Sequence, residues 1–128
     1  QIGVHLKVFE KDRNQLIIEA GFGLGEAVVS GQITPDSYIV DKEDDSLIDI
    51  NVAEQERGLF RKKDELGNEW VNLAIDKKGL QKLTKDQIAE LAELIINIEK
   101  HYDFPVDVEW ALEKEVFYIT QSRPITTL

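Results

Sequence analysis

The sequence predicts an α+β fold with a mostly antiparallel sheet, one long helix and short helices. Hydrophobic residues alternate in several short segments, one segment has helical spacing, and turn residues separate neighbouring strand candidates. The chain has 128 residues and is 42% hydrophobic, which is enough for one domain with a core and short for two. We therefore expect a single domain over residues 1–128.

Composition excludes several classes of protein. The 25 acidic and 15 basic residues give a net charge of −10, which would repel nucleic acid. The absence of cysteine excludes disulfides and thiolate metal sites and suits a cytoplasmic protein. No apolar run is long enough to span a membrane, so we expect no membrane partner. Because the sequence also lacks methionine, we expect it to be a piece of a longer protein.

The N-terminal third contains three strand candidates and a glycine-rich turn. Residues Gly3 to Glu10 and Gln15 to Ala20 alternate in polarity around the polar turn "KDRN", which predicts a hairpin. In "GFGLGEAVVSG" we expect a short helix over Glu26 to Ser30 that ends at Gly31. The segment "DSYIVDK" predicts another strand.

The middle of the chain is acidic and then β-rich. Residues 41–56 are acidic, with Asp41, Glu43 and Asp45 at alternate positions. A calcium loop would also need glycine at Ser46 and glutamate at Val52, so we interpret the segment as a solvated edge. Between Ile48 and Ala74 we expect two or three antiparallel strands, with a Gly-Asn turn at Gly67–Asn68.

The long helix has a clear start. Thr84 and Gln87 form a T-x-x-Q capping box, and the helix should end near His101. Apolar residues follow the capping box at helical spacing: Ile88, Leu91, Ala92 and Ile95.

Two strands are predicted at the end of the chain, Phe104 to Leu112 and Glu115 to Ser122. Along the first, the even positions are apolar, and Asp107 and Glu109 point the other way. Along the second, strict alternation places Gln121 and Arg123 on one face, below Phe117 and Ile119.

Whether Glu109 and Gln121 share a face depends on the connection between these strands. A two-residue turn at Glu113 and Lys114 would separate them, whereas a three-residue loop or a β-bulge would bring them together. The hypothesis of a shared site therefore predicts an odd loop. An exposed polar sheet face explains the same residue types and stays open as an alternative.

If the register is favourable, one surface collects two carboxylates, an amide oxygen and a guanidinium. Mg²⁺ binds through one or two carboxylate or amide oxygens together with phosphate oxygens, and arginine grips phosphate bidentately. The residues Asp107, Glu109, Gln121 and Arg123 thus suit the phosphates of a metal-bound nucleotide.

Two segments resemble a known family. "GFGLGEAVVSGQITPDSYIVDK" and "DVEWALEKEVFYITQSRPIT" are similar to the C-terminal part of the ATP-binding domain of phosphoenolpyruvate synthases, pyruvate phosphate dikinases and rifampin phosphotransferases. The resemblance implies the C-terminal lobe of an ATP-grasp domain. It further implies that Glu109 and Gln121 hold Mg²⁺ against ATP, and that Arg123 contacts phosphate and stabilises charge during transfer.

The glycine-rich segment belongs to the first of these motifs. Gly23, Gly25 and Glu26 are candidate ATP-binding residues, because glycines let backbone N–H groups approach phosphate, although a tight strand-to-helix turn explains the glycines equally well. Glu19 also lies in the motif, without an assigned role. In place of the family's threonine and Asn-Pro after the first strand, this chain reads "KVFEKDRN", which puts phosphate binding by the first hairpin in doubt.

The family implies an ATP-dependent phosphotransferase with paired acceptors, which passes phosphate from ATP through a histidine to pyruvate. Its expected partners are ATP, a phosphohistidine domain and an N-terminal ATP-grasp lobe of the same full-length protein; alone, the chain should be inactive. His5 and His101 are isolated in the sequence and neither is the phosphorylated histidine. A non-catalytic nucleotide-binding or acidic protein-interaction module, and a rifampin-type phosphotransferase lobe, remain alternatives.

Overall fold

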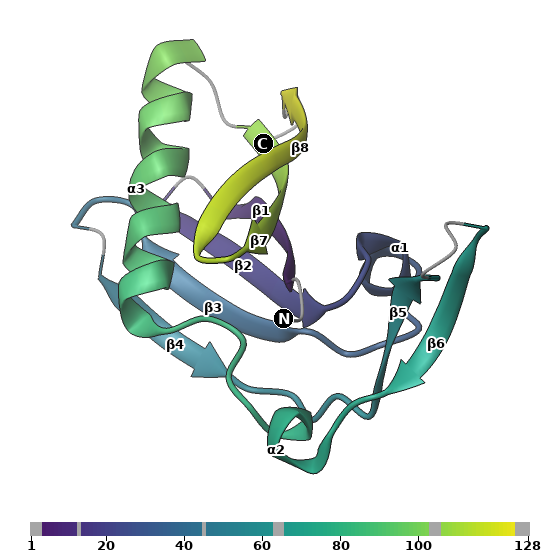
Figure 1. The fold of residues 1–128 in the computed structure, drawn as a ribbon. Coiled ribbons are helices and arrows are strands. Elements are labelled where there is room, and N and C mark those ends of the chain that lie inside the picture. Colours follow the sequence, from purple (N-terminus) through teal and green to yellow (C-terminus); the bar gives the residue numbers. More distant parts are fainter. Residues whose placement is uncertain (1–3, 13, 45, 63–65, 103–105, 125–128) are drawn as a thin grey trace.

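The described part of the chain folds into a six-stranded antiparallel sheet, a separate two-stranded sheet and three helices (Figure 1). The computed structural model describes residues 4–12, 14–44, 46–62, 66–102 and 106–124. The large sheet has the strand order β4-β3-β2-β1-β7-β8, and β5 pairs with β6. The elements are β1 (Val4–Asp12), β2 (Gln15–Phe22), α1 (Gly25–Val29), β3 (Asp36–Asp41), β4 (Leu47–Asn51), β5 (Arg57–Arg61), β6 (Asn68–Asn72), α2 (Ile75–Lys78), α3 (Lys85–Tyr102), β7 (Val106–Glu113) and β8 (Val116–Pro124).

These elements confirm the α+β class, with a mostly antiparallel sheet, one long helix and short helices, as in an ATP-grasp-like lobe. The predicted strands and the first hairpin are present within one or two residues of their expected ends. The short helix starts one residue earlier than predicted, and Gly31 follows its end with φ +77°. Among the described residues, no helix is long and apolar enough to cross a membrane.

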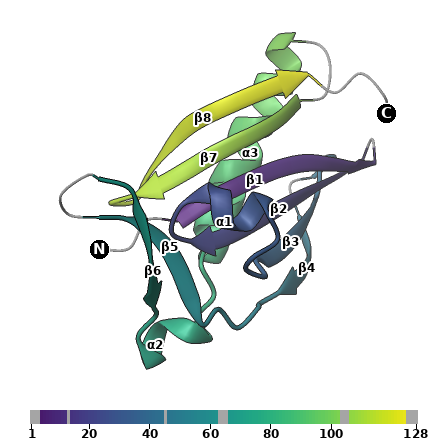
Figure 2. The ribbon, with the colours of Figure 1, turned by 90° about the vertical axis from the view of Figure 1, so that its right-hand side faces the viewer.

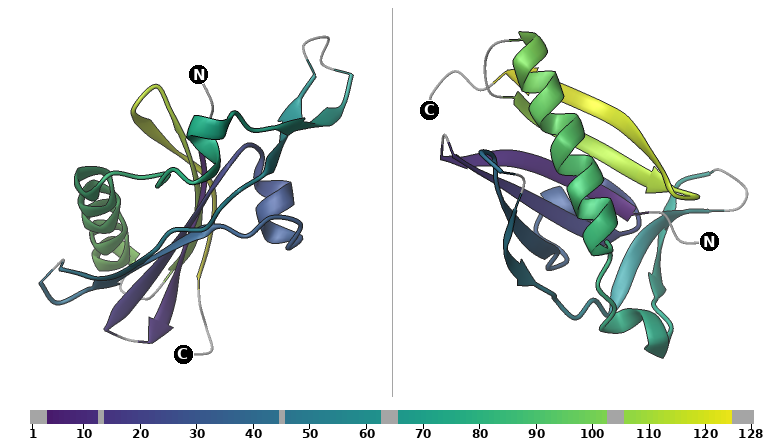
Figure 3. Two further views of the ribbon diagram at one scale, coloured as in Figure 1. Left: turned by 90° about the horizontal axis from the view of Figure 1, so that it is seen from below. Right: turned by 90° about the vertical axis from the view of Figure 1, so that its left-hand side faces the viewer.

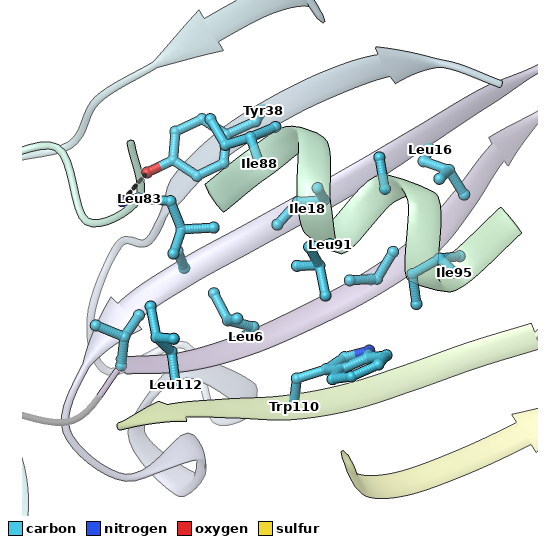
Figure 4. Packing of buried hydrophobic residues seen from close by; sticks show 14 of the residues in the cluster. Leu6, Leu16, Ile18, Tyr38, Leu83, Ile88, Leu91, Ile95, Trp110 and Leu112 are labelled. Carbon is cyan, nitrogen blue, oxygen red and sulfur yellow. Dashed lines mark hydrogen bonds between the residues drawn. The ribbon is translucent and has the colours of Figure 1, made fainter. Parts of the chain in front are cut away.

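Helix α3 covers one face of the large sheet, and α1 lies on the other side (Figure 3). The capping box forms as predicted. The backbone N–H of Thr84 donates to Gln87 Oε1 at 2.9 Å, and the backbone N–H of Gln87 donates to Thr84 Oγ1 at 3.1 Å. The apolar stripe of α3 packs on the strands (Figure 4). The core includes Leu6, Leu16, Ile18, Tyr38, Leu83, Ile88, Leu91, Ile95, Trp110 and Leu112.

A buried ion pair joins the segment before α3 to the sheet. Lys82 Nζ lies 2.9 Å from Asp36 Oδ1, and both side chains are fully buried. The Asp36 carboxylate also accepts hydrogen bonds from the backbone N–H groups of Ala53 and Lys82 and from the Tyr38 hydroxyl. Burial and the bond to Asp36 raise the pKa of Tyr38, so its hydroxyl remains a donor. This network ties three distant segments together.

Two details differ from the sequence-based expectations. Asn68 is not a turn residue but pairs with Arg61 as the first residue of β6, so the hairpin connection runs from Lys62 to Gly67. Helix α2 was not assigned from the sequence, because its four residues are too short to give a helical pattern.

We predict that Lys82→Met lowers the free energy of unfolding by about 3–5 kcal/mol, because the Asp36 carboxylate is left buried without its cation. Denaturant unfolding of the purified chain measures this change. Lys78→Met is the matched control, since Lys78 is partly exposed and pairs with the exposed side chain of Glu56, and this variant should unfold like the parent. Equal effects of the two substitutions would contradict the role given to the buried pair.

Candidate functional site

The predicted metal and phosphate ligands belong to the last hairpin, where β7 lies between β1 and β8 (Figure 2). The backbone register opposes Glu109 to Gln121 and Asp107 to Arg123. Directly opposed positions of an antiparallel pair belong to the same face of the sheet. The four positions therefore share the face that is turned away from α3. The side chains of Asp107, Gln121 and Arg123 lie outside the described part of the structure, so their contacts stay predictions.

A β-bulge, and not an odd loop, produces this register. The strands are joined by a two-residue turn at Lys114 and Glu115, whose φ values of 50° and 65° suit a tight hairpin. That turn alone would oppose Glu109 to Thr120, but the register shifts between Glu109 and Trp110. The expectation of an odd loop is thus wrong, and the two-residue turn lies one residue later than the turn considered at Glu113 and Lys114. The β-bulge, which was the other way to bring Glu109 opposite Gln121, is present.

The bulge also corrects the expected pattern along β8. Ile119 is opposed to Trp110, whose side chain is buried against α3, whereas Gln121 is opposed to Glu109. Ile119 and Gln121 therefore do not share a face, because the extra residue between them interrupts the alternation.

Glu109 has a histidine beside it that the sequence did not connect to the site. The Nε2 atom of His5 lies 3.3 Å from Glu109 Oε1, and the two side chains are only 10% and 18% exposed. Nε2 thus lies close to the carboxylate, although it has no well-aligned hydrogen-bond acceptor among the described residues. His5 and Glu109 are far apart in the sequence, and pairing between β1 and β7 brings them together.

Two opposing influences act on the His5 imidazole. Burial lowers the pKa of His5, and the nearby Glu109 carboxylate offsets part of that effect. Lys7, which is opposed to Glu109 across the strands, also disfavours a charged imidazole. The balance favours a neutral ring at neutral pH, with one nitrogen carrying a proton.

The glycine-rich segment is shaped by close packing. A Cβ atom on Gly25 would lie 2.2 Å from His5 Cε1, so any side chain there would displace the ring. Gly23 has φ +96° and its Cβ would lie 2.7 Å from the Leu59 carbonyl, which makes glycine necessary there as well. The backbone N–H of Leu24 donates to the same carbonyl at 2.8 Å. These contacts favour the tight-turn explanation, while ATP binding by the glycines stays a prediction.

A buried amide holds the start of this segment. Gln55 is 2% exposed, and its side chain pairs with both backbone groups of Phe22: the Phe22 N–H donates to Oε1 at 3.0 Å, and Nε2 donates to the Phe22 carbonyl at 2.9 Å. The same Nε2 also donates to the Arg57 carbonyl at 2.9 Å. Phe22 is opposed to Val4 of β1 on one side, and the register with β3 on the other side ends at Ala20, so on that side a side chain supplies its hydrogen bonds. The sequence offered no signal for this role of Gln55.

An open hollow of about 590 Å³ lies between α1 and the β5–β6 hairpin. It brings two of the predicted ATP-binding residues next to a cation that was not singled out, Arg61. Its lining is formed by Leu24, Gly25, Glu26, Arg61, Gly67 and Asn68. Because Gly25 contacts His5 and His5 contacts Glu109, the hollow is connected to the β7–β8 hairpin by a continuous set of contacts.

The donor types at the opposed positions 109 and 121 are a carboxylate and an amide oxygen. No group of three or more histidine, cysteine, aspartate or glutamate side chains capable of holding a metal occurs within the described parts of the chain. Glu109 offers one carboxylate, and the opposed position carries the amide of Gln121. Mg²⁺ commonly takes one or two such oxygens and completes its shell with water and phosphate oxygens.

We predict that Gly25→Ala lowers the free energy of unfolding by about 1–3 kcal/mol, because the added methyl group collides with the His5 ring. Gly79→Ala is the matched control, since a Cβ at Gly79 meets no atom within 4 Å, and it should be neutral or slightly stabilising. Thermal unfolding of both variants measures the difference. If Gly25→Ala proves as harmless as Gly79→Ala, the close contact between Gly25 and His5 is refuted.

Comparison with known proteins gives a consistent result. Residues 4–128 match the pyruvate phosphate dikinase AMP/ATP-binding domain. The chain is 49% identical to a probable phosphoenolpyruvate synthase of Methanocaldococcus jannaschii and 44% identical to a rifampicin phosphotransferase of Bacillus subtilis, over 90% and 91% of its length. It is 42% identical to a phosphoenolpyruvate synthase of Pyrococcus furiosus over 91% of its length.

The chain spans only part of these relatives. It covers 10% of the first protein, 13% of the second and 15% of the third. The match to the domain itself nevertheless extends over nearly all of the chain, from residue 4 to residue 128. The chain therefore belongs to the pyruvate phosphate dikinase AMP/ATP-binding domain family.

Proposed function

We propose that the chain is the Mg-ATP-binding lobe of a phosphotransferase that passes phosphate from ATP through a histidine to pyruvate. The observation that carries this proposal is the register of the last hairpin, which opposes Glu109 to Gln121 and Asp107 to Arg123. An acid, an amide and a guanidinium on one face are what metal-bound phosphates require. Membership of an AMP/ATP-binding domain family supports the nucleotide.

Each residue has a defined task in this proposal. Glu109 and Gln121 supply oxygen ligands for Mg²⁺, and Arg123 binds phosphate oxygens through its planar fork of N–H groups. When bound, magnesium supplies positive charge that offsets the charge on the phosphate oxygens. Gly23, Gly25 and Glu26 line or border the approach to the nucleotide, and Asp107 contributes negative charge nearby. These residues act by positioning and charge neutralisation, which is the main requirement of phosphoryl transfer.

The remaining parts of the reaction belong to other regions of a longer protein. The chain covers 10–15% of three relatives, which leaves room for a phosphohistidine domain and an N-terminal ATP-grasp lobe. Neither histidine of this chain is the proposed acceptor, because His5 is buried beside Glu109 and His101 belongs to α3 on the other side of the sheet. The chain alone is therefore proposed to bind Mg-ATP weakly and not to turn it over.

A second acceptor is favoured by one specific comparison. The relative in Bacillus subtilis that is 44% identical is a rifampicin phosphotransferase, whereas the archaeal relatives are phosphoenolpyruvate synthases. The ATP-binding lobe would be common to both, so its residues do not distinguish pyruvate from the antibiotic. The acceptor is decided by domains outside this chain.

We predict that Glu109→Gln in the full-length protein lowers phosphate transfer from Mg-ATP by about 100-fold, because a charged metal ligand is lost. Glu113→Gln is the matched control: Glu113 is an exposed residue of the same strand, and its loss should leave the rate unchanged. ³¹P NMR with pyruvate or rifampicin as acceptor measures the transfer and identifies the acceptor. An unchanged rate in Glu109→Gln would refute the proposed site.

For the 128-residue chain, we predict that Mg-ATP shifts the backbone NMR signals of β7 and β8 selectively and weakly. Without the other lobe the nucleotide makes only part of its contacts, so binding is weak. A response confined to the acidic segment 41–56 on addition of protein partners, with a silent hairpin, would favour a non-catalytic interaction module.

A further inference from the structure

His5 occupies a place that is built to hold its ring. On β1 it is opposed to Gly21 of β2 and to Ala111 of β7, the two smallest residue types, which leave space above the sheet for an imidazole. A third small residue, Gly25, lies against the ring, where a Cβ would come within 2.2–2.5 Å of three ring atoms. Small neighbours on three sides therefore fix the ring position.

The ring so held presents Nε2 to Glu109. Glu109 is two residues from Ala111 along β7, which makes it the diagonal neighbour of His5 across the strands. Nε2 is buried, finds no aligned acceptor among the described residues, and has Glu109 Oε1 at 3.3 Å. A buried N–H group requires an acceptor, and this carboxylate is close enough to become one with a small rotation of either side chain.

We propose that His5 is a positioning residue for the metal-binding carboxylate: its Nε2–H donates to Glu109 Oε1 and thereby orients the carboxylate for magnesium. This inference rests on the proposed function. Ligating carboxylates are usually held by hydrogen bonds from a second layer of residues, and loss of such a bond weakens metal binding. Through Gly25, the same ring also couples the position of Glu109 to the glycine-rich segment beside the hollow.

The test uses Mn²⁺ in place of Mg²⁺ and measures its affinity for the chain in the presence of ATP. The readout is the paramagnetic broadening that bound Mn²⁺ causes in the NMR signals of the chain. His5→Phe keeps a ring against Gly25 but has no N–H, and it should weaken Mn²⁺ binding by about 10-fold. His5→Gln retains an N–H donor and should bind within about 3-fold of the parent. ATP affinity without metal should be the same in all variants. A variant with a general folding defect would lose this affinity as well.

His101→Phe is the matched control, because it makes the same replacement in α3, on the other side of the sheet from Glu109, and should not alter Mn²⁺ affinity. Full Mn²⁺ affinity in a folded His5→Phe would overturn the role of His5 while leaving the proposed function in place. Absence of any Mn²⁺-dependent ATP binding by the parent chain would overturn both.

A measurement on the parent chain does not depend on the folding of any variant. ¹⁵N NMR of the imidazole at neutral pH reports which nitrogen carries the proton. The proposal requires the proton on Nε2 and a change in the His5 signals when Mg²⁺ and ATP are added. A proton on Nδ1, with Nε2 unprotonated toward Glu109, would overturn it.

Discussion

The β-bulge between Glu109 and Trp110 is the constraint on which the candidate site depends. Neighbouring residues of strand β7 belong to opposite faces of the sheet: Trp110 is buried in the core, and Glu109 is on the other face. A tight two-residue turn alone would oppose Glu109 to Thr120. One extra residue in β8 opposes Glu109 to Gln121 and leaves the core pairing of Trp110 intact. A local irregularity thereby allows the hairpin to pack against α3 while positions 107, 109, 121 and 123 share the opposite face.

The rest of the molecule stabilises the segments around that hairpin through buried polar groups. The Asp36–Lys82 pair attaches the segment before α3 and the backbone at Ala53 to β3. Two residues after Ala53, Gln55 binds the backbone of Phe22 at the end of β2. Buried polar groups are costly unless every hydrogen bond is made, so these contacts specify one arrangement of the connecting segments.

The glycine-rich segment and the β7 carboxylate are coupled because both contact one ring. His5 lies between Gly25 and Glu109, and its neighbours across the strands are glycine and alanine. In this part of the site the glycines have a packing role that is independent of any ligand. The same packing brings Gly25 and Glu26 to a hollow that also includes Arg61 from the distant β5–β6 hairpin.

Elements with local signals could be predicted before the fold was known. Alternation predicted most strands of the large sheet, and the Thr84–Gln87 capping box with its apolar stripe predicted α3. The choice of Glu109, Gln121 and Arg123 came from residue types and from the family resemblance, and the family is confirmed.

Features that depend on which strands are neighbours could be seen only in the folded chain. The bulge in β8 leaves no mark in local composition, because the pairing of a whole hairpin against the core selects the register. His5 is more than 100 residues from Glu109 in the chain, and only the pairing of β1 with β7 brings them together. Local patterns describe the state of single segments, whereas these contacts depend on long-range pairing.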